Sequence, residues 1–440
     1  MNKEHGLWLV TLPVSLTLAT ACSTQSPTTT VKNMTTSTTM TTNNETASSA
    51  DQKNSLQSPN IPWSNRPNQS FDIIRHIHMF DSKTGWQTGY KNRKFVLGLT
   101  SDGGTTWHQI PMPHGLPEQS EGFTNEPLAA IVNPNDIIMA WTLDNQVHID
   151  RTTNGGQTWA KSDLTLQPPL NALSAIVFSD PQHGWIAAQS SPASGHTQKA
   201  IYRTQDGGST WNVVSVDNGY IPSTSPTTKT LPESAFLLNL SASTSHDLWA
   251  GLEPTDVYNQ KFEPLYHSND GGKSWHVSSI PIPAAVRPTD NLIGTIAPSL
   301  SEQSGIFLAY TQPSNNTGPG YAQLYLSKDG GQSWSKSGAE ISSNPFVTSL
   351  CDGRIAWLGD IHQAHLVETS NAGATWRTIQ PGPLYRKTIQ KAPLAELDVV
   401  NDSTAFAVFT DENPQTTFKD HSVLLKTTDG GLTWRMLKSQ

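Results

Sequence analysis

Two histidines separated by one residue are the most direct candidates for metal chemistry. His76 and His78 flank Ile77 in an alternating stretch, and alternation places both imidazoles on one face of a β-strand. Such a pair could supply half of a tetrahedral zinc site. A similar stretch recurs later with Ser174 and Ile176 at these positions, so we expect the histidines to pack between elements or line a channel. The sequence therefore predicts no metal site and no cofactor.

Short acidic or amide side chains recur in an octet that appears seven times. Every copy has Ser or Thr first, Asp or Asn third, Gly fifth, Ser or Thr seventh and Trp eighth. A short side-chain oxygen accepts hydrogen bonds from backbone N–H groups just ahead in a tight turn, and glycine supplies the positive φ. We expect a hairpin whose Trp starts the next strand and packs between sheets. The third and eighth residues are Asp102 and Trp107, Asn154 and Trp159, Asp206 and Trp211, Asp270 and Trp275, Asp329 and Trp334, Asn371 and Trp376, and Asp429 and Trp434.

A second recurring element precedes the octets and consists of alternating apolar residues followed by a large aromatic side chain. The segment from Ile74 to Trp86 shows it, and the segment from Ala172 to Trp185 repeats it. Each repeat is then interpreted as four strands: an inner strand, a second strand through the aromatic, a third strand into the octet, and an outer strand. The further copies are expected to end in Trp141, Trp249, Phe307, Trp357 and Phe406.

The spacing of the octets predicts the architecture. Successive octet tryptophans are separated by 42 residues (Trp334 to Trp376) up to 64 residues (Trp211 to Trp275), which suits a propeller blade of roughly 40 to 50 residues with loop insertions. A single four-stranded sheet buries neither face, whereas sheets packed around an axis bury both. We therefore predict an all-β, seven-bladed β-propeller over residues 60–440.

The octets resemble the BNR or Asp-box repeats of known propellers. The pattern Phe-x-Asp-x-x-x-Gly-Trp followed by Thr-x-Asp-Gly-Gly-x-Thr-Trp is similar to the branch typified by the photosystem II assembly and stability factor. This resemblance implies a non-catalytic scaffold that binds a partner. Photosynthetic members of the branch carry an arginine-rich surface patch, whereas the arginines here are scattered through the repeats, which argues against a photosystem partner. We expect a protein or glycan partner.

Sialidase-type glycoside hydrolases share the Asp-box and provide the enzyme alternative. They need three arginines that converge on a carboxylate, a Tyr/Glu nucleophile pair and an Asp acid, because the anionic sugar passes through an oxocarbenium-like state. Their early arginine lies in an Arg-Ile-Pro motif, whereas Arg75 is followed by His76 and Ile77. We assign no catalytic residue, and a hydrolase that uses the central funnel stays open as the alternative.

A partner is expected to bind the face of the ring opposite the octets. In Asp-box propellers the octets join the third and fourth strands, so the other face carries the loops between second and third strands and the blade-to-blade connections. The long loops are 189–198, 253–264, 311–321 and 410–421, and the long connections are 216–234, 281–291 and 380–393. Their aromatic and charged residues are the candidate contacts. These are Tyr258, Arg287, Tyr321, Tyr385, Arg386 and Asp411.

The N-terminus predicts export and lipid anchoring. Residues 1–21 contain a short apolar run that ends in Ala19-Thr20-Ala21, and the following Cys22 resembles the acylated cysteine of a bacterial lipobox. An ordinary secreted protein and a membrane-anchored one are the alternatives. Residues 22–59 are rich in Ser and Thr and hold too little apolar surface to fold, so we expect a disordered spacer. The protein would then sit on the outer face of the cell membrane.

Charge excludes one class of partner. The net charge is −8, from 28 basic and 36 acidic residues, without a dense Lys/Arg cluster. Nucleic-acid binding needs a basic face that displaces counterions from phosphates, so we expect no nucleic-acid partner. We expect a monomer whose contact with the membrane is the lipid on Cys22.

Overall fold

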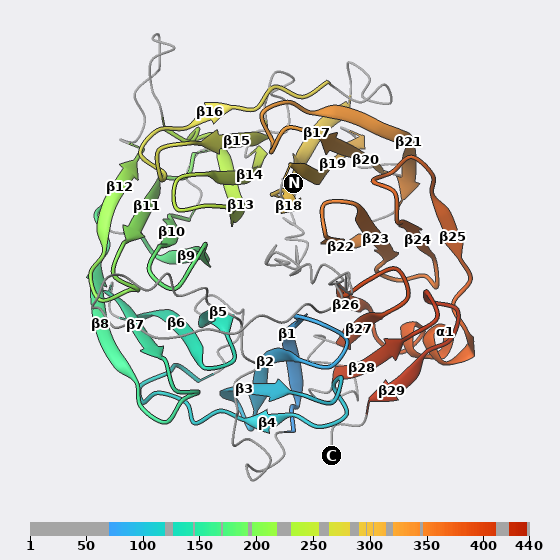
Figure 1. Ribbon diagram of the computed structural model, residues 1–440, viewed down its shortest axis with the longest axis horizontal. Coiled ribbons are helices and arrows are strands. Elements are labelled where there is room, and N and C mark those ends of the chain that lie inside the picture. Colours follow the sequence, from blue (N-terminus) through green and yellow to red (C-terminus); the bar gives the residue numbers. More distant parts are fainter. Residues whose placement is uncertain are drawn as a thin grey trace, which may run out of the picture.

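Seven antiparallel sheets form a closed ring in the computed structural model (Figure 1). The structure describes residues 70–118, 126–143, 146–168, 170–191, 196–217, 230–254, 264–281, 290–295, 297–301, 303–313, 320–343, 346–410 and 422–437. The predicted all-β, seven-bladed propeller is confirmed. The predicted signal segment, Cys22 and the predicted spacer lie outside these residues. Within them, no helix has the length and apolar character needed to cross a membrane.

Each blade is built from consecutive strands, and we number the blades in chain order. Blades 1 to 3 are β1 (Ile73–Met79), β2 (Gly85–Lys91), β3 (Lys94–Thr100) and β4 (His108–Gln109); β5 (Leu128–Asn133), β6 (Asp136–Leu143), β7 (Gln146–Thr152) and β8 (Ala160–Thr165); and β9 (Ala172–Phe178), β10 (Gly184–Gln189), β11 (Lys199–Thr204) and β12 (Asn212–Val216). Blades 4 and 5 are β13 (Ala235–Ala242), β14 (Leu248–Pro254), β15 (Leu265–Ser268) and β16 (His276–Val277); and β17 (Asp290–Thr295), β18 (Ser299–Ser301), β19 (Ser304–Pro313), β20 (Gly320–Ser327) and β21 (Ser335–Ser343). Blades 6 and 7 are β22 (Phe346–Cys351), β23 (Ile355–Asp360), β24 (Leu366–Thr369) and β25 (Arg377–Ile379); and β26 (Leu394–Val399), β27 (Ala405–Thr410), β28 (Ser422–Thr427) and β29 (Arg435–Leu437), with helix α1 (Pro383–Ile389) between these two blades.

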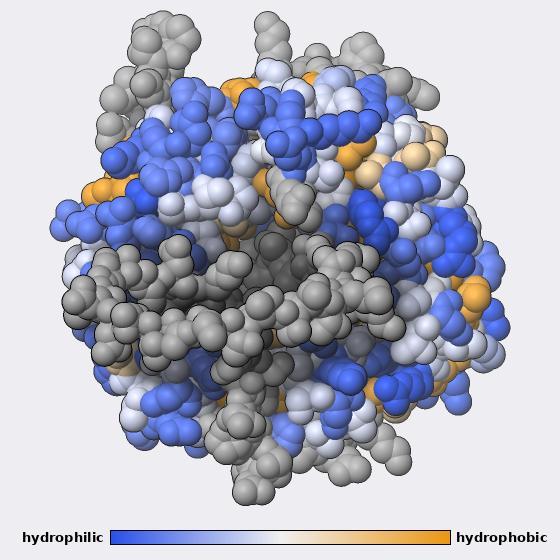
Figure 2. Space-filling model, viewed as in Figure 1, coloured by the Kyte–Doolittle hydropathy of each residue, from blue (hydrophilic) through white to orange (hydrophobic). Residues whose placement is uncertain are grey.

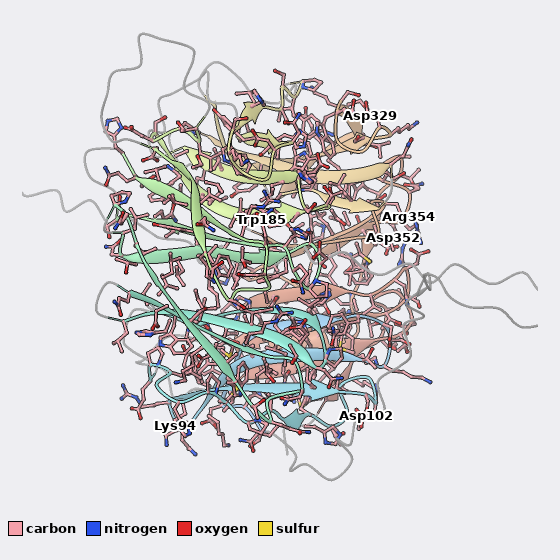
Figure 3. The ribbon with its side chains drawn as sticks, turned by 60° about the vertical axis from the view of Figure 1, so that its left-hand side comes forward. Lys94, Asp102, Trp185, Asp329, Asp352 and Arg354 are labelled. Carbon is pink, nitrogen blue, oxygen red and sulfur yellow. The ribbon has the colours of Figure 1, made fainter. Side chains whose placement is uncertain are left out.

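The strand order gives the ring two different faces. Within each sheet the neighbours follow chain order, apart from the extra strand β18, which pairs with β19. Because the strands are antiparallel, the first and third hairpins of every blade emerge at one face, which we call the turn face. The second hairpins and the blade-to-blade connections emerge at the other, the loop face. Figure 3 shows turn-face residues Asp102, Asp329, Asp352 and Arg354 on one side and Lys94, which begins β3, on the other.

The seven octets fold alike at the turn face. In blade 3, Thr204 Oγ1 lies 2.8 Å from Asp206 Oδ1 and accepts the Gly208 N–H at 2.8 Å. Asp206 Oδ1 accepts the Thr210 N–H at 2.9 Å, and Asp206 Oδ2 accepts its hydroxyl at 2.6 Å. Where Asn154 replaces Asp, its Nδ2 donates to the seventh-position hydroxyl at 2.8 Å. The third residue therefore closes the turn in either chemical form.

The octets also join neighbouring blades, which the sequence did not indicate. Arg151 directly precedes the octet of blade 2, and its Nη1 donates to the carbonyl of Gly207 in the octet of blade 3 at 2.6 Å. Its Nε and Nη2 hold the Asp136 carboxylate at 2.7 and 2.6 Å. The φ of Gly207 is +70°, and a Cβ there would collide with the guanidinium of Arg151. This glycine is therefore required by the neighbouring blade as well as by the turn.

Equivalent contacts recur at other seams with different donors. Each donor belongs to one blade and each carbonyl to the octet of the next. They are Arg377 to Gly430 at 3.0 Å, Lys426 to Gly103 at 2.9 Å, and the Trp185 indole to Gly271 at 2.9 Å. At the seam between blades 5 and 6 the donor is the small hydroxyl of Ser337, which bonds the carbonyl of Ala372. The side chain of Ser337 is smaller than the donors at those seams, and the octet that it contacts has Ala372 where the other octets have glycine.

The aromatic residues of the second strands do not occupy equivalent positions in the strand pairing of all seven blades. Five blades pair the second-strand aromatic with the residue before the octet, for example Trp86 with Leu99. In blades 2 and 5 this position is taken by Ile138 and Ile306. The expectation that Trp141 and Phe307 end equivalent copies is therefore wrong. Register is set by the first hairpin and by pairing with the octet, not by the position of an aromatic side chain.

Blades 7 and 1 meet without sharing a strand among the described residues, since β26–β29 and β1–β4 each form their own sheet. We call this contact the closing seam. An apolar cluster fills it, with Phe71, Ile74 and Met79 packed with Phe406 and Leu437. The backbone N–H of Ser422 donates to the carbonyl of Asp72 at 2.9 Å. Side-chain packing and a few polar contacts therefore close the ring.

Candidate functional site

Half of the predicted contact residues can be placed. Tyr258, Arg287 and Asp411 lie outside the described residues. Tyr321 lies near the loop-face end of β20 and is partly exposed. Arg386 is exposed on α1, where its Nη1 donates to the carbonyl of Pro381 at 3.0 Å. Tyr321 and Arg386 stay predictions as binding residues.

The expected exposure of Tyr385 is wrong. Its side chain is fully buried, and its ring lies 5.0 Å from that of Phe409 and 5.2 Å from that of Trp434. The reason is helix α1, which an all-β interpretation of the sequence does not include. The helix turns Tyr385 and Ile389 inward at i, i+4 spacing while Arg386 stays outside. The proline after Gly382 and this spacing were the available signals.

Connection length distinguishes the two faces of the ring. At the turn face the first hairpins are short, as in residues 80–84 of blade 1 and 400–404 of blade 7. At the loop face the connections vary in length, from two residues between β2 and β3 to the long segments 217–234 and 380–393. The face seen in Figure 2 is predominantly hydrophilic with scattered apolar residues. The connections that vary most in length therefore begin and end at the loop face.

A buried lysine fastens one long connection at the loop face. Lys199 Nζ donates to Thr197 O at 2.9 Å, to Thr197 Oγ1 at 2.8 Å and to Pro232 O at 2.8 Å. Asp217 accepts the Lys199 backbone N–H at 2.8 Å. Burial lowers the pKa of the Lys199 amine, although the carboxylates of Asp217 and Glu233 raise it. Lys199 thus bonds Asp217 at the start of the 217–234 connection and Pro232 near its end, and a lone Lys before an apolar strand gave no signal of this.

One loop-face carboxyl has acid–base properties suited to proton transfer. Glu253 lies near the loop-face end of β14, and burial raises its pKa to about 7. Its charge also contributes to the raised pKa of Tyr310 on β19 of the next blade, after burial. A glycosidase pairs such an acid with a second carboxylate, but burial is the only influence on the pKa of Glu253. Glu253 is therefore a candidate acid whose pKa no neighbouring charge among the described residues shifts.

Charged side chains gather on the inner strands at the closing seam. His76 Nδ1 lies 3.8 Å from Glu396 Oε2, and His78 Nδ1 lies 3.3 Å from Asp398 Oδ1. Burial by itself lowers the pKa of His76, but the nearby carboxylate of Glu396 outweighs burial, so the pKa is raised. Burial raises the pKa of Glu396. The two histidines thus meet carboxylates of the neighbouring blade, as the packing interpretation expected.

The described residues contain no group of three or more His, Cys, Asp or Glu side chains placed to hold a metal ion. Four arginines in this part of the chain pair with separate carboxylates instead of converging on one funnel. They are Arg75 with Glu126 at 3.0 Å, Arg151 with Asp136 at 2.6 Å, Arg377 with Glu368 at 2.7 Å, and Arg354 with Asp402 at 3.0 Å. A sialidase-type triad would need three free guanidinium groups at one point.

Comparisons with known proteins give one family-model match and several similar solved structures. Residues 325–336 match the BNR/Asp-box repeat model, and no curated protein matches the chain. Similar solved structures include YCF48 bound to D1 peptide (16% identity, 83% of this chain and 93% of that chain, TM-score 0.47) and YCF48 from Cyanidioschyzon merolae (16%, 82% and 96%, 0.43). The GH93 α-L-arabinofuranosidase of Fusarium graminearum with arabinobiose is also similar (13%, 72% and 95%, 0.40). The octet of blade 5 therefore matches the Asp-box repeat model, and the other six octets share its residue pattern.

Proposed function

We propose that the protein is a non-catalytic binding scaffold whose loop face binds a protein or glycan partner. The observation that carries the proposal is the contrast between the two faces. Turn-face hairpins are short and repetitive, whereas loop-face connections such as 217–234 and 380–393 vary in length and sequence. Binding residues on rigid scaffolds concentrate in such variable loops.

The chemistry of the turn face supports this choice. The polar side chains of each octet are engaged in their own turn, as those of Thr204 and Asp206 illustrate. Octet carbonyls such as that of Gly207 are occupied by the preceding blade. Groups already bonded within the ring have little capacity left for a ligand. We therefore place the partner at the loop face.

We further propose that the scaffold is a monomer exported and held at the outer face of the cell membrane by a lipid on Cys22. The short apolar run before Ala21 and the position of Cys22 support this. Substitution of Cys22 by Ser is expected to abolish incorporation of a labelled fatty acid and release the protein from the membrane fraction. Retention of the label by the variant would contradict the proposal.

A crosslinking pull-down from native membranes tests the binding role. Residues 411–421 or 255–263, which join second and third strands at the loop face, would each be replaced by a Gly/Ser segment of equal length. A matched control substitutes the exposed turn-face residue Lys83 by Glu. We expect capture of a specific partner to fall with a loop-face replacement and to survive in the control. Capture that only the turn-face change reduces would contradict the proposal.

Glycoside hydrolysis is the second candidate, and the near-neutral pKa of Glu253 is the observation that favours it. Purified protein would be assayed on fluorogenic sialosides and a panel of glycosides. Turnover that disappears in Glu253→Gln, with unchanged thermal unfolding, would replace the binding-only proposal. Without turnover, the scaffold proposal stands.

A further inference from the structure

The closing seam differs from the other six seams in one respect. Every other pair of neighbouring blades is joined by the chain itself, for example β4 to β5 or β25 to β26. Blades 7 and 1 have no such connection among the described residues, so non-covalent contacts alone oppose their separation. The chemistry of those contacts therefore decides how firmly the ring stays closed.

Polar contacts between neighbouring blades, on or near the inner strands, use a different kind of acceptor at this seam. At three other seams, neutral side chains of one blade accept backbone N–H groups of the next. These pairs are Gln189 with the Leu237 N–H at 3.1 Å, Asn239 with the Ala297 N–H at 2.8 Å, and Ser349 with the Val399 N–H at 3.0 Å. At the closing seam the acceptors are carboxylates. Glu396 accepts the Ile77 N–H at 3.2 Å and Asp398 accepts the Met79 N–H at 2.7 Å.

These two carboxylates are nearly inaccessible to water. The side chains of Glu396 and Asp398 are 3% and 7% exposed, and they stand two residues apart on β26. A buried carboxylate is costly unless an opposite charge compensates it. The imidazoles of His76 and His78 on β1 are the neighbouring groups able to carry that charge. Glu126 and Arg75 also act on His76, the first raising and the second lowering its pKa.

We propose that the closing seam is a pH-dependent fastener. In mildly acidic solution, protonated His76 compensates Glu396, and blades 7 and 1 stay together. In alkaline solution the imidazole is neutral, Glu396 and Asp398 keep two negative charges side by side in a dry environment, and the blades separate more often. This inference concerns the ring itself and does not depend on the proposed partner.

The direction of the effect follows from proton linkage. The folded ring raises the pKa of both His76 and Glu396 above their ordinary values of 6.5 and 4.5. Groups with raised pKa values contribute stability that is fully present below the ordinary value and is lost as pH rises through the folded value. For His76 the loss therefore begins above pH 6.5. The seam is expected to be tighter at pH 6 than at pH 9.

Hydrogen exchange measured by mass spectrometry tests this at the seam itself. Protection factors, corrected for intrinsic exchange, would be compared at pH 6 and pH 9 for peptides covering β1 and β26. Peptides covering β9 and β13, whose seam is joined by the chain, provide the internal reference. We expect protection at β1 and β26 to fall at least about threefold further than at the reference strands.

Two variants decide the origin of that fall. Glu396→Gln keeps an oxygen for the Ile77 N–H but cannot ionise, and His76→Gln removes the titrating imidazole. Both are expected to abolish the excess pH response. His148→Gln removes the imidazole of the exposed His148–Asp163 pair within blade 2 and is expected to leave the response unchanged. An equal pH response at all seams would overturn the proposal, and so would a response that persists in His76→Gln. If Glu396→Gln fails to fold, the result for His76→Gln decides alone.

Discussion

Replacing Arg151 with methionine is expected to destabilise the propeller by about 2–4 kcal/mol. The guanidinium makes two bonds to Asp136 and one to the carbonyl of Gly207 across the seam between blades 2 and 3. Methionine keeps much of the aliphatic volume but removes all three donors. The substitution therefore separates the polar role of Arg151 from its packing role.

The magnitude follows from what the substitution leaves behind. The side chains of Arg151 and Asp136 are 15% and 9% exposed, so the carboxylate would lose its counter-charge where water compensates poorly. Breaking a buried ion pair costs about 3–5 kcal/mol, and partial exposure reduces the estimate to about 2–4 kcal/mol. This is a substantial share of the roughly 5–15 kcal/mol that stabilises a typical domain.

Arg354 provides a matched control. It too connects neighbouring blades, bonding Asp402 at 3.0 Å and lying 3.4 Å from Asp352, but its side chain is 43% exposed. Figure 3 shows Asp352 and Arg354 next to each other on the surface. Exposed ion pairs contribute about 0–1 kcal/mol, so Arg354→Met is expected to change stability by less than about 1 kcal/mol.

Urea unfolding followed by tryptophan fluorescence measures both variants, with the slope of the transition as a check that the unfolded states are comparable. A double variant, Arg151→Met with Asp136→Asn, is expected to recover part of the loss because no charge is left unpaired. Equal, small effects of Arg151→Met and Arg354→Met would refute the idea that octet carbonyls and buried cations hold the seams together.

Three further predictions address the octets and α1. Asp206→Ala should cost about 1–2 kcal/mol in urea unfolding because the turn loses its acceptor, whereas Asp206→Asn, the residue that blade 2 has as Asn154, should be close to neutral. Burial raises the pKa of Asp206, but the hydrogen bonds of the turn outweigh burial and lower the pKa overall. As pH falls below 3.8, the wild-type protein should therefore lose more stability than Asp206→Asn. Thermal melts at several pH values can check this. Gly207→Ala should lower stability by at least about 1 kcal/mol, since the added methyl would meet Arg151; an unchanged melting temperature would contradict this. Tyr385→Ala should cost about 3–5 kcal/mol and Tyr385→Phe much less, in the same unfolding assay, and a small effect of the alanine variant would argue against the observed burial.

The blade number and the turn chemistry were predictable because they depend on local interactions. The bonds of Asp206 lie within its own octet, so the octet sequence contains everything the turn needs. Interactions between blades were not predictable in the same way. Arg151 donates to the carbonyl of Gly207, which lies fifty-six residues later in the chain. The equivalent residue before the octet of blade 5 is Leu326, whose side chain has no hydrogen-bond donor. A single sequence does not indicate which seams use a cation.

The candidate site was predicted less well for a related reason. The type of a residue and its location in a long connection identify neither its burial nor its partners. Tyr385 illustrates the limit: an aromatic residue in a long connection is buried because α1 covers the space beside Phe409 and Trp434. Lys199 shows the opposite case. It is a charged residue that is almost fully buried, because backbone carbonyls accept the hydrogen bonds that water would otherwise accept from its amine.

The construction of each blade from one uninterrupted stretch of chain has a consequence for engineering. No sheet depends on strands from distant parts of the sequence, and the first and last blades are already neighbours. Joining those ends with a short linker and cutting the chain between β12 and β13 would leave all seven sheets intact. The ring should therefore accept circular permutation at its blade boundaries, and a permuted protein would place the gap in covalent continuity at a seam of the experimenter's choice.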